Sequence, residues 1–381
     1  MTGIKHEEVI RPAAKAGSWY TKESMCISLT FFCFSKGEKV QPLGALKKKK
    51  NLKKKKNATA KQLSEEMNTW LKSAKVGVEG QVKAVISPHA GYSFSGATGA
   101  HSYIHMLRHK RREEIKRIFV LGPDHCGATH GKTSRCLLSG CTRWQTPHGD
   151  VTIDVDTNKE LLKTGYFSKL TLKEDASEHS IEMCIPYIAY VMKGCNYAIV
   201  PMMVGHLHDR DFDKLAPVLA KYFDDERTFF VISSDFCHWG KHYDYMPLPK
   251  DLPFVFQLAN NNNNNNNKDK DKDRNEEKTK EKRHHNDDDD DNDDDNDDDY
   301  DDDYDDDNDD DYDEDDNQRS ANKKTSHNDS NNGKEIWEFI QAMDHIGMGH
   351  IERLSFPDFR KYLEHTGNTI CGEYPLSLML K

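Results

Sequence analysis

The sequence predicts an α/β domain in which helices cover both faces of a central sheet. Three observations favour this fold class. Short apolar runs alternate with helical patterns along the chain, several of those runs lack polar residues at alternate positions, and three of them are followed directly by metal-capable side chains. Strands that are buried on both faces have such continuous apolar patterns, because neither face meets water. Alternation of strands and helices is typical of α/β sheets.

The expected elements follow one another in a regular order. Helical periodicity begins at Leu63, Met67, Trp70 and Leu71, whose spacing is that of the apolar stripe of an amphipathic helix. Beyond this helix, the apolar runs predict strands at residues 82–86, 118–121, 197–204 and 228–232. The helical patterns between and after them predict helices at residues 96–107, 181–192, 211–223, 336–343 and 356–365.

Two low-complexity tracts interrupt this pattern. Residues 36–56 hold 10 Lys, and residues 287–316 hold 24 acidic residues after an unbroken run of Asn at 260–267. Such segments cannot bury enough apolar area to offset the entropy of the chain. We therefore expect one domain formed by residues 1–23, 59–259 and 333–381. A Lys-rich insert at 24–58 and an Asn/Asp-rich disordered insert at 260–332 would interrupt it.

The formal net charge of -11 is a property of the Asp-rich tract, because the chain outside the two tracts is close to neutral. No nucleic-acid or membrane partner is therefore expected for the domain. The longest apolar run, residues 25–34, is shorter than the roughly 20 residues that span a bilayer. Nine Cys without a C-x-x-C pair favour reduced thiols and a cytoplasmic protein. The Lys tract is also compatible with nuclear localisation, although a solvated insert is the stronger interpretation.

Three segments place polar side chains directly after an apolar run. His89 follows the run in VKAVISPHAGY, Asp124 and His125 follow the run in RIFVLGPDHCG, and Asp235 and His238 follow the run in FFVISSDFCHWG. Open α/β sheets bind ligands at the carboxyl ends of their strands, so these side chains are expected to share a crevice. A single His after a strand is more often a hydrogen-bonded loop residue than a ligand. Three such segments together favour a metal site with open coordination positions.

The segment EHSIEMCIPY, residues 178–187, is a further candidate. If it begins a helix, His179 and Glu182 lie three residues apart on one face, so either of them could point into the crevice. The alternative is that Glu178 and Glu182 only favour the positive N-terminal end of that helix. The sequence leaves both interpretations open.

These segments together resemble the Memo family (mediator of receptor-kinase-driven cell motility). GSWY, SPHAGY, LGPDH, TPHGDVTID, EHSIEM, PMMVG, SSDFCHWG and TICG occur in the order seen in that family and cover most of the chain outside the two tracts. The resemblance implies a single three-layer domain with a central mixed sheet, similar to class III extradiol dioxygenases. It also implies a metal pocket formed by His89, His125 and Cys371, which would hold iron or copper. Asp235 and His238 would line the same pocket.

The chain departs from the family pattern in two respects. Cys126 and Cys184 stand where family members commonly carry His. The resemblance also implies further closing strands after TICG, so a chain that ends at Lys381 is expected to lack these C-terminal strands.

Three functions follow from these observations. The first is a Memo-type intracellular metal-binding protein that takes part in redox signalling and in cell motility or cytoskeletal regulation. The second is a dioxygenase-like, metal-dependent oxidoreductase in which His238 acts as acid and base and Asp235 orients it. The third is an adaptor without catalysis that holds a phosphotyrosine-containing peptide or another signalling protein. The third hypothesis comes only from the resemblance, because the sequence shows no Arg cluster of the kind that phosphate recognition favours.

Overall fold

The computed structural model describes residues 8–14, 60–76, 80–132, 134–256 and 335–381. The expected Lys-rich insert at 24–58 and the Asn/Asp-rich insert at 260–332 lie outside these residues, so their boundaries stay predictions. The described elements up to Phe256 and from Ile336 onward form one compact unit. The expected single α/β domain is confirmed for the part of the chain that the structure describes.

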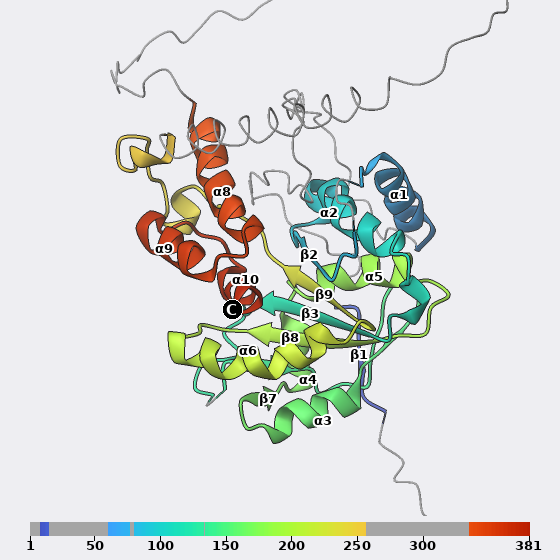
Figure 1. The fold of residues 1–381 in the computed structure, drawn as a ribbon. Helices are drawn as coiled ribbons and strands as arrows, with labels where there is room; N and C mark the ends of the chain where they lie inside the picture. The colour runs from blue at the N-terminus through green and yellow to red at the C-terminus, as the bar shows by residue number, and fades with distance from the viewer. Residues whose placement is uncertain (1–7, 15–59, 77–79, 133, 257–334) are drawn as a thin grey trace, which may run out of the picture. The chain divides into compact units, whose positions relative to one another are not determined.

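A mixed six-stranded sheet forms the centre of this unit (Figure 1). Its order is β2-β9-β3-β8-β4-β7, and its strands are β2 (Ala84–Ser87), β9 (Thr228–Ser233), β3 (Arg117–Pro123), β8 (Ala198–Val204), β4 (Cys136–Leu138) and β7 (Phe167–Lys169). The first four strands in this order run parallel, β4 is antiparallel to β8, and β7 is parallel to β4. The structure thus confirms the mixed sheet and the four strands that the apolar runs predicted.

A second, three-stranded sheet ties the N-terminal segment to the domain. It consists of β1 (Ile10–Arg11), β5 (Arg143–Trp144) and β6 (Val151–Thr152), in the order β1-β5-β6. Strand β1 runs parallel to β5, and β6 is antiparallel to β5. Residues near the start of the chain are therefore held against residues more than 130 positions later.

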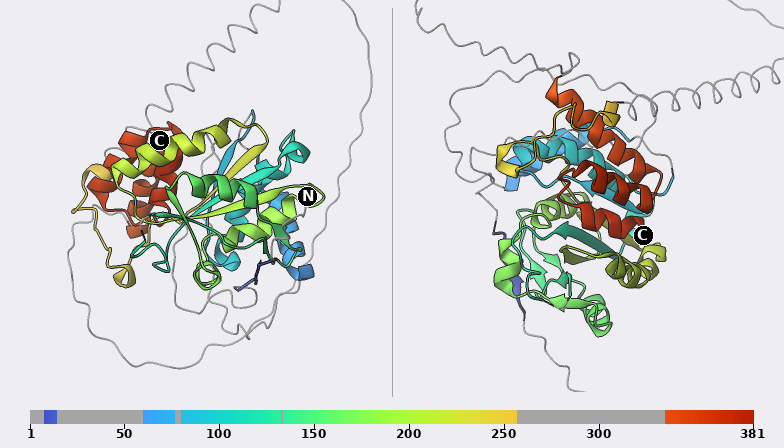
Figure 2. Two further views of the ribbon diagram at one scale, coloured as in Figure 1. Left: turned by 90° about the horizontal axis from the view of Figure 1, so that it is seen from below. Right: turned by 90° about the vertical axis from the view of Figure 1, so that its left-hand side faces the viewer.

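Helices cover both faces of the central sheet. Because successive side chains of a strand point to opposite faces, each strand contributes to two separate hydrophobic clusters. In β3, Ile118 and Val120 belong to one hydrophobic cluster, whereas Phe119 and Leu121 belong to the other. The first cluster includes side chains of α1 (Ala60–Ser73), α2 (Tyr92–Leu107) and α5 (Ile185–Val191). The second includes side chains of α6 (Asp209–Asp224), α8 (Ile336–Glu352), α9 (Phe356–Thr366) and α10 (Glu373–Leu380). Figure 2 shows the C-terminal helices, in red, gathered beside α6.

The remaining elements are short. They are η1 (Arg112–Glu114), α3 (Val155–Lys163), α4 (Leu172–Ser177), η2 (Glu182–Cys184) and η3 (Lys241–Tyr243). The apolar residues near Lys381 form α10, which packs against α6, β3 and β9. Among the described residues, no helix combines the length and the apolar character that crossing a membrane requires.

Two of the predicted helices differ from the observed ones in informative ways. The helix expected at 181–192 is a 3-10 turn, η2, followed by α5 with Pro186 in its first turn. The helix expected at 96–107 begins earlier, at Tyr92, and includes Gly96. A Cβ at Gly96 would lie 2.5 Å from the ring of Trp70, so a glycine at this position allows α1 and α2 to pack closely.

Candidate functional site

Three neighbouring strands end at the same edge of the sheet and bring the predicted site residues together. Strands β2, β9 and β3 are adjacent, and Ser87 at the end of β2 is paired with Ser233 at the end of β9. His89 follows β2 by two residues, Asp235 follows β9 by two, and His125 follows β3 by two. The strand-end rule, which predicted from the sequence that these side chains lie together, therefore describes the observed arrangement.

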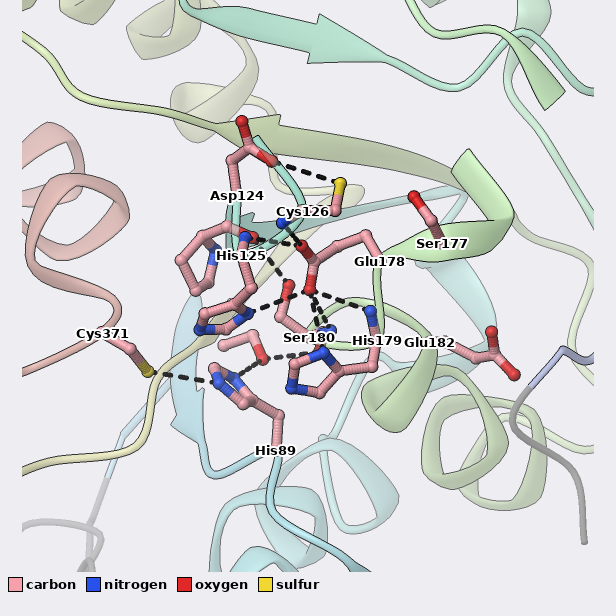
Figure 3. A network of polar contacts seen from close by, with 12 residues as sticks. His89, Asp124, His125, Cys126, Ser177, Glu178, His179, Ser180, Glu182 and Cys371 are labelled. Carbon is pink, nitrogen blue, oxygen red and sulfur yellow. Dashed lines mark hydrogen bonds and ion pairs between the residues drawn. The ribbon is translucent and has the colours of Figure 1, made fainter. Parts of the chain in front are cut away.

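Three imidazoles lie close together at this edge (Figure 3). The ring centroids of His89 and His125 are 5.2 Å apart, those of His89 and His179 are 5.6 Å apart, and those of His125 and His179 are 4.7 Å apart. One nitrogen of each ring lies within 4.8 Å of the others, so a single ion could contact all three. The side chain of His89 is buried, whereas those of His125 and His179 are 33% and 29% exposed. The group is thus anchored on one side and open to solvent on the other.

His179 lies in the segment for which the sequence left two alternatives. This residue joins the imidazole group from the turn between α4 and η2, whereas Glu182 points away from it. The carboxylate of Glu182 lies 2.6 Å from Nη1 of Arg11 instead. The two side chains diverge because residues 178–181 form a turn and not a helix, so the three-residue spacing does not place them on one face.

Cys371 approaches the group from the segment between α9 and α10. Its Sγ lies 3.2 Å from Nε2 of His89 and accepts a hydrogen bond of 3.2 Å from the backbone N–H of Asp235. The sulfur contacts His89 and lies outside the set of imidazole nitrogens that are mutually within 4.8 Å. The next residue is Gly372, where a Cβ would lie 2.9 Å from the carbonyl oxygen of Ser233. A glycine is needed here for the thiol to come this close to the end of β9.

The buried carboxylate of Glu178 orients His125. Its Oε1 lies 3.0 Å from Nδ1 of His125, and its Oε2 accepts the backbone N–H of the same residue at 2.6 Å. Burial alone would raise the pKa of Glu178, but the hydrogen bonds from His125 and from backbone amides hold that pKa well below its ordinary value. Because Nδ1 is bonded to the carboxylate, Nε2 of His125 is the ring nitrogen left to contact an ion. Carboxylate–imidazole pairs of this kind commonly support metal-binding histidines.

A hydroxyl network sets the tautomer of His89. Its Nδ1 lies 2.7 Å from Oγ of Ser233, and Oγ of Ser233 donates its proton to the carbonyl oxygen of Ser180 at 2.8 Å. Since the hydroxyl proton is used in that second bond, Nδ1 of His89 must donate and Nε2 carries the lone pair. Burial, opposed by the nearby Asp235 carboxylate, lowers the pKa of His89 to about 3. The imidazole is therefore neutral at physiological pH, with its lone pair directed towards Cys371.

Asp235 and His238 lie on the loop that follows β9. Oδ1 of Asp235 accepts the backbone N–H of His89 at 2.9 Å, and Oδ2 lies 3.9 Å from Nε2 of His89. His238 is held by Thr369, whose Oγ1 accepts the backbone N–H at 2.8 Å and whose carbonyl oxygen lies 2.9 Å from Nδ1. Asp235 thus contacts the imidazole group directly, and His238 is fixed to the segment that carries Cys371.

Comparisons with known proteins establish the family of this chain. The chain matches the family described as Memo-like protein over residues 55–381. The chain belongs to this family. It is 30% identical over 325 residues to Protein memo-1 homolog of Caenorhabditis elegans, an alignment that covers 85% of this chain and 67% of that protein. It is 28% identical over 379 residues to Protein MEMO1 of Danio rerio and 27% identical over the same length to Protein MEMO1 of Homo sapiens. Both alignments cover 99% of this chain and 85% of the relative.

A second set of metal-capable side chains lies next to the three imidazoles, and its members already make hydrogen bonds within the protein. Asp124, Cys126 and Glu178 have ligand atoms within 4.8 Å of one another. The carboxylate of Asp124 accepts hydrogen bonds from the backbone of Ala128 and from the backbone and hydroxyl of Thr129, at 2.7 to 2.9 Å. These bonds close the loop that carries His125, so we assign this second set to holding the loop.

Sequence reasoning missed the role of Glu178 in this Memo-like site. One of the two interpretations left open by the sequence placed Glu178 at the N-terminal end of a helix, whereas the residue accepts hydrogen bonds from His125 and from the amides that follow it. No local pattern identifies this role, because the imidazole that Glu178 bonds lies 53 positions earlier in the chain.

Proposed function

We propose that this Memo-like chain is an intracellular metal-binding protein. In this proposal an iron or copper ion is held by His89, His125 and Cys371, with His179 as a further imidazole within reach. The observation that carries the proposal is the convergence of three imidazoles within 4.8 Å of one another, with a thiol 3.2 Å from one of them. Its cellular setting, in redox signalling and cell motility, rests on the family resemblance and is part of the proposal.

The donor set fits such an ion. Imidazole nitrogens and a thiolate are borderline to soft ligands that suit iron, copper and zinc better than calcium or magnesium. Metal ligation needs a neutral imidazole, and burial keeps His89 neutral. The carboxylate of Glu178 and the hydroxyl of Ser233 orient two of the rings. The residues present therefore provide ligands and the groups that orient them.

A bound iron or copper ion would supply one-electron redox chemistry to the pocket. The chain's own residues would determine which ion enters and what reaches it. The thiol of Cys371 makes the site softer than one completed by a carboxylate, which favours copper as well as iron. The exposed faces of His125 and His179 leave one side of the pocket open to a small molecule.

Metal content measured by elemental analysis tests the proposal. We compare the wild type with His89→Ala/His125→Ala after loading with iron or copper and removal of loosely bound ions. The matched control is His206→Ala/His208→Ala, which removes two histidines whose rings lie 4.9 Å apart between β8 and α6. We expect the first variant to lose the ion and the control to retain it. Equal metal content in the wild type and in His89→Ala/His125→Ala would overturn the proposal.

A dioxygenase-like enzyme is the second candidate function. It is favoured by the place of Asp235, whose carboxylate lies 3.9 Å from Nε2 of His89, and by the anchoring of His238 to the Thr369 segment. In this candidate function, His238 exchanges protons with a substrate at the open side of the pocket. Oxygen uptake by the iron-loaded protein with catechol-type substrates tests it. A rate that is no higher than that of His238→Ala with every substrate would argue against enzymatic activity.

The peptide-binding hypothesis would need a cation exposed at the pocket. The guanidinium of Arg11 contacts residues next to the turn that carries Glu178 and His179, but it is buried and ion-paired with Asp175 and Glu182. It is thus committed to the protein interior. Pull-down with a phosphotyrosine peptide and its unphosphorylated form tests this hypothesis, and equal recovery of the protein by both peptides would remove it.

A further inference from the structure

We propose that Arg11 is a positioning residue for the pocket, which it acts on by holding the turn that carries Glu178 and His179. The proposal rests on the metal-binding function proposed above and adds a residue more than 160 positions away from that turn. Arg11 touches none of the three imidazoles in the contacts that the structure describes. Its effect would pass through the turn between α4 and η2.

The guanidinium of Arg11 donates hydrogen bonds to residues on both sides of this turn. Its Nη2 donates to the backbone carbonyl oxygens of Asp175 and Glu178, at 2.8 and 3.0 Å. Its Nε also donates to the carbonyl of Asp175 at 3.1 Å, and Nη1 lies 2.6 Å from the carboxylate of Glu182. One rigid, planar group therefore fixes three points along residues 175–182.

The turn held by Arg11 also carries residues of the candidate site, Glu178 and His179. The carboxylate of Glu178 accepts the backbone N–H groups of His125, Cys126, His179 and Ser180, at 2.6 to 3.2 Å. Because Arg11 bonds the carbonyl of Glu178, it sets the position from which this carboxylate reaches the β3 loop. A shift of the turn would move the orienting partner of His125 and would move His179 itself.

The surroundings of Arg11 keep it in one orientation. The residue is 1% exposed, and its guanidinium lies 4.1 Å from the centre of the Trp144 ring. The indole Nε1 of Trp144 donates to Oγ of Ser139, which in turn donates to the carboxylate of Asp175. Asp175 also lies 3.2 Å from Nε of Arg11. These contacts depend on the planar guanidinium with its several N–H donors, and a lysine ammonium would not reproduce them.

Arg11 is well placed for a selective test, because it lies outside the central sheet. Strand β1, which carries it, pairs with β5 in the three-stranded sheet. Strands β2, β9 and β3 form their ladder without it. A substitution at Arg11 is therefore expected to loosen the turn before it loosens the sheet that carries His89 and His125.

The experiment compares Arg11→Lys and Arg11→Met with Arg117→Lys as the matched control. Arg117 is also ion-paired, at 2.8 Å to Asp154, but it lies at the opposite end of β3 from the pocket. Two quantities are measured. They are the dissociation constant for copper or iron by competition with a chelator, and the hydrogen-exchange rate of each backbone amide in the metal-free protein.

For both Arg11 variants, we expect the dissociation constant to rise by at least about 10-fold, the lower end of what is typical when a residue that supports metal ligands is lost. We also expect faster exchange at the four amides that donate to Glu178, with exchange in β3 and β9 unchanged. Arg117→Lys should leave the dissociation constant and these four amides as in the wild type.

Unchanged exchange at those four amides would overturn the positioning role, and so would an equal acceleration at every amide of the domain. If the wild type itself retains no metal, the proposed function fails, and the amide rates in the metal-free protein still decide the role of Arg11.

Discussion

Asp344 on α8 makes the stability of this protein depend on pH in a direction that can be worked out. Its side chain is 2% exposed, and Oδ1 accepts a hydrogen bond of 2.8 Å from Nδ2 of Asn368. Burial raises the pKa of Asp344 to about 7, although the bond from Asn368 and the backbone of Cys237 oppose the shift. Asn368 lies in the segment that leads to Cys371. A buried carboxyl group that favours its neutral form is therefore hydrogen-bonded to this segment.

The sign follows from the difference between the folded and unfolded states. In the unfolded chain Asp344 titrates near its ordinary pKa of 3.8, and in the folded protein near 7. Below about pH 4 both states are protonated, and the contribution of this group to stability is fully present. As the pH rises towards 7, the unfolded state ionises first, so the free energy of unfolding falls. The full loss is about 4 kcal/mol at 1.36 kcal/mol per pKa unit, of which about 3 kcal/mol falls between pH 5 and 8.

Urea unfolding of the wild type and Asp344→Asn at pH 5 and pH 8 measures this effect. Asparagine is nearly the same size and stays neutral, so the variant is expected to gain about 3 kcal/mol relative to the wild type between the two pH values. Other titrating groups are shared by both proteins and cancel in the comparison. Asp358→Asn, at an exposed position on α9, is the control and should show no such gain. A stability difference between Asp344→Asn and the wild type that is the same at both pH values would refute the reasoning.

Two further substitutions probe the residues that shape the pocket. Gly372→Ala forces a Cβ against Ser234 and to 2.9 Å from the carbonyl of Ser233, so we expect a loss of about 1–3 kcal/mol in urea unfolding and weaker metal retention. Unchanged values of both would show that the segment can shift freely. Glu178→Gln replaces a buried carboxylate that accepts several N–H groups with a neutral amide, which should cost about 3 kcal/mol or more at pH 7. Because the folded pKa of Glu178 is depressed, this cost should shrink as the pH falls below about 4.5, and a cost that is independent of pH would contradict the assignment.

The sequence was sufficient to predict four strands of the central sheet and the edge that carries the candidate site, because both depend on local patterns, but it did not predict β4, β7 or the three-stranded sheet. Strands β3, β8 and β9 are almost fully buried on both faces, which requires the continuous apolar runs that identify them. Their carboxyl ends meet at one edge in any parallel arrangement, so the proximity of His89, His125 and Asp235 followed without knowledge of the strand order. Only the structure shows that β2, β9 and β3 are immediate neighbours.

The contacts that hold the site residues in position could not be predicted from the sequence, because they join segments that are far apart in the chain. Arg11 bonds residues 164 to 171 positions away, and no spacing rule relates such pairs. For residues 178–187 the sequence left two interpretations open, and the one that placed His179 and Glu182 on one face required a helix from residue 178. Residues 178–181 form a turn, so the two side chains point in different directions.

The chain leaves the described domain and re-enters it at neighbouring points around the Asn/Asp-rich tract. Phe256 is the last described residue before this tract, and its ring centroid lies 5.8 Å from that of Phe339 in the first turns of α8. Both side chains pack in the hydrophobic cluster that also contains residues of α9 and α10. Because this packing holds Phe256 next to α8, the helices that follow are placed on the same domain as the strands before the tract. Cys371 lies 3.2 Å from His89 across 282 positions of sequence, since packing of α8, α9 and α10 determines its position.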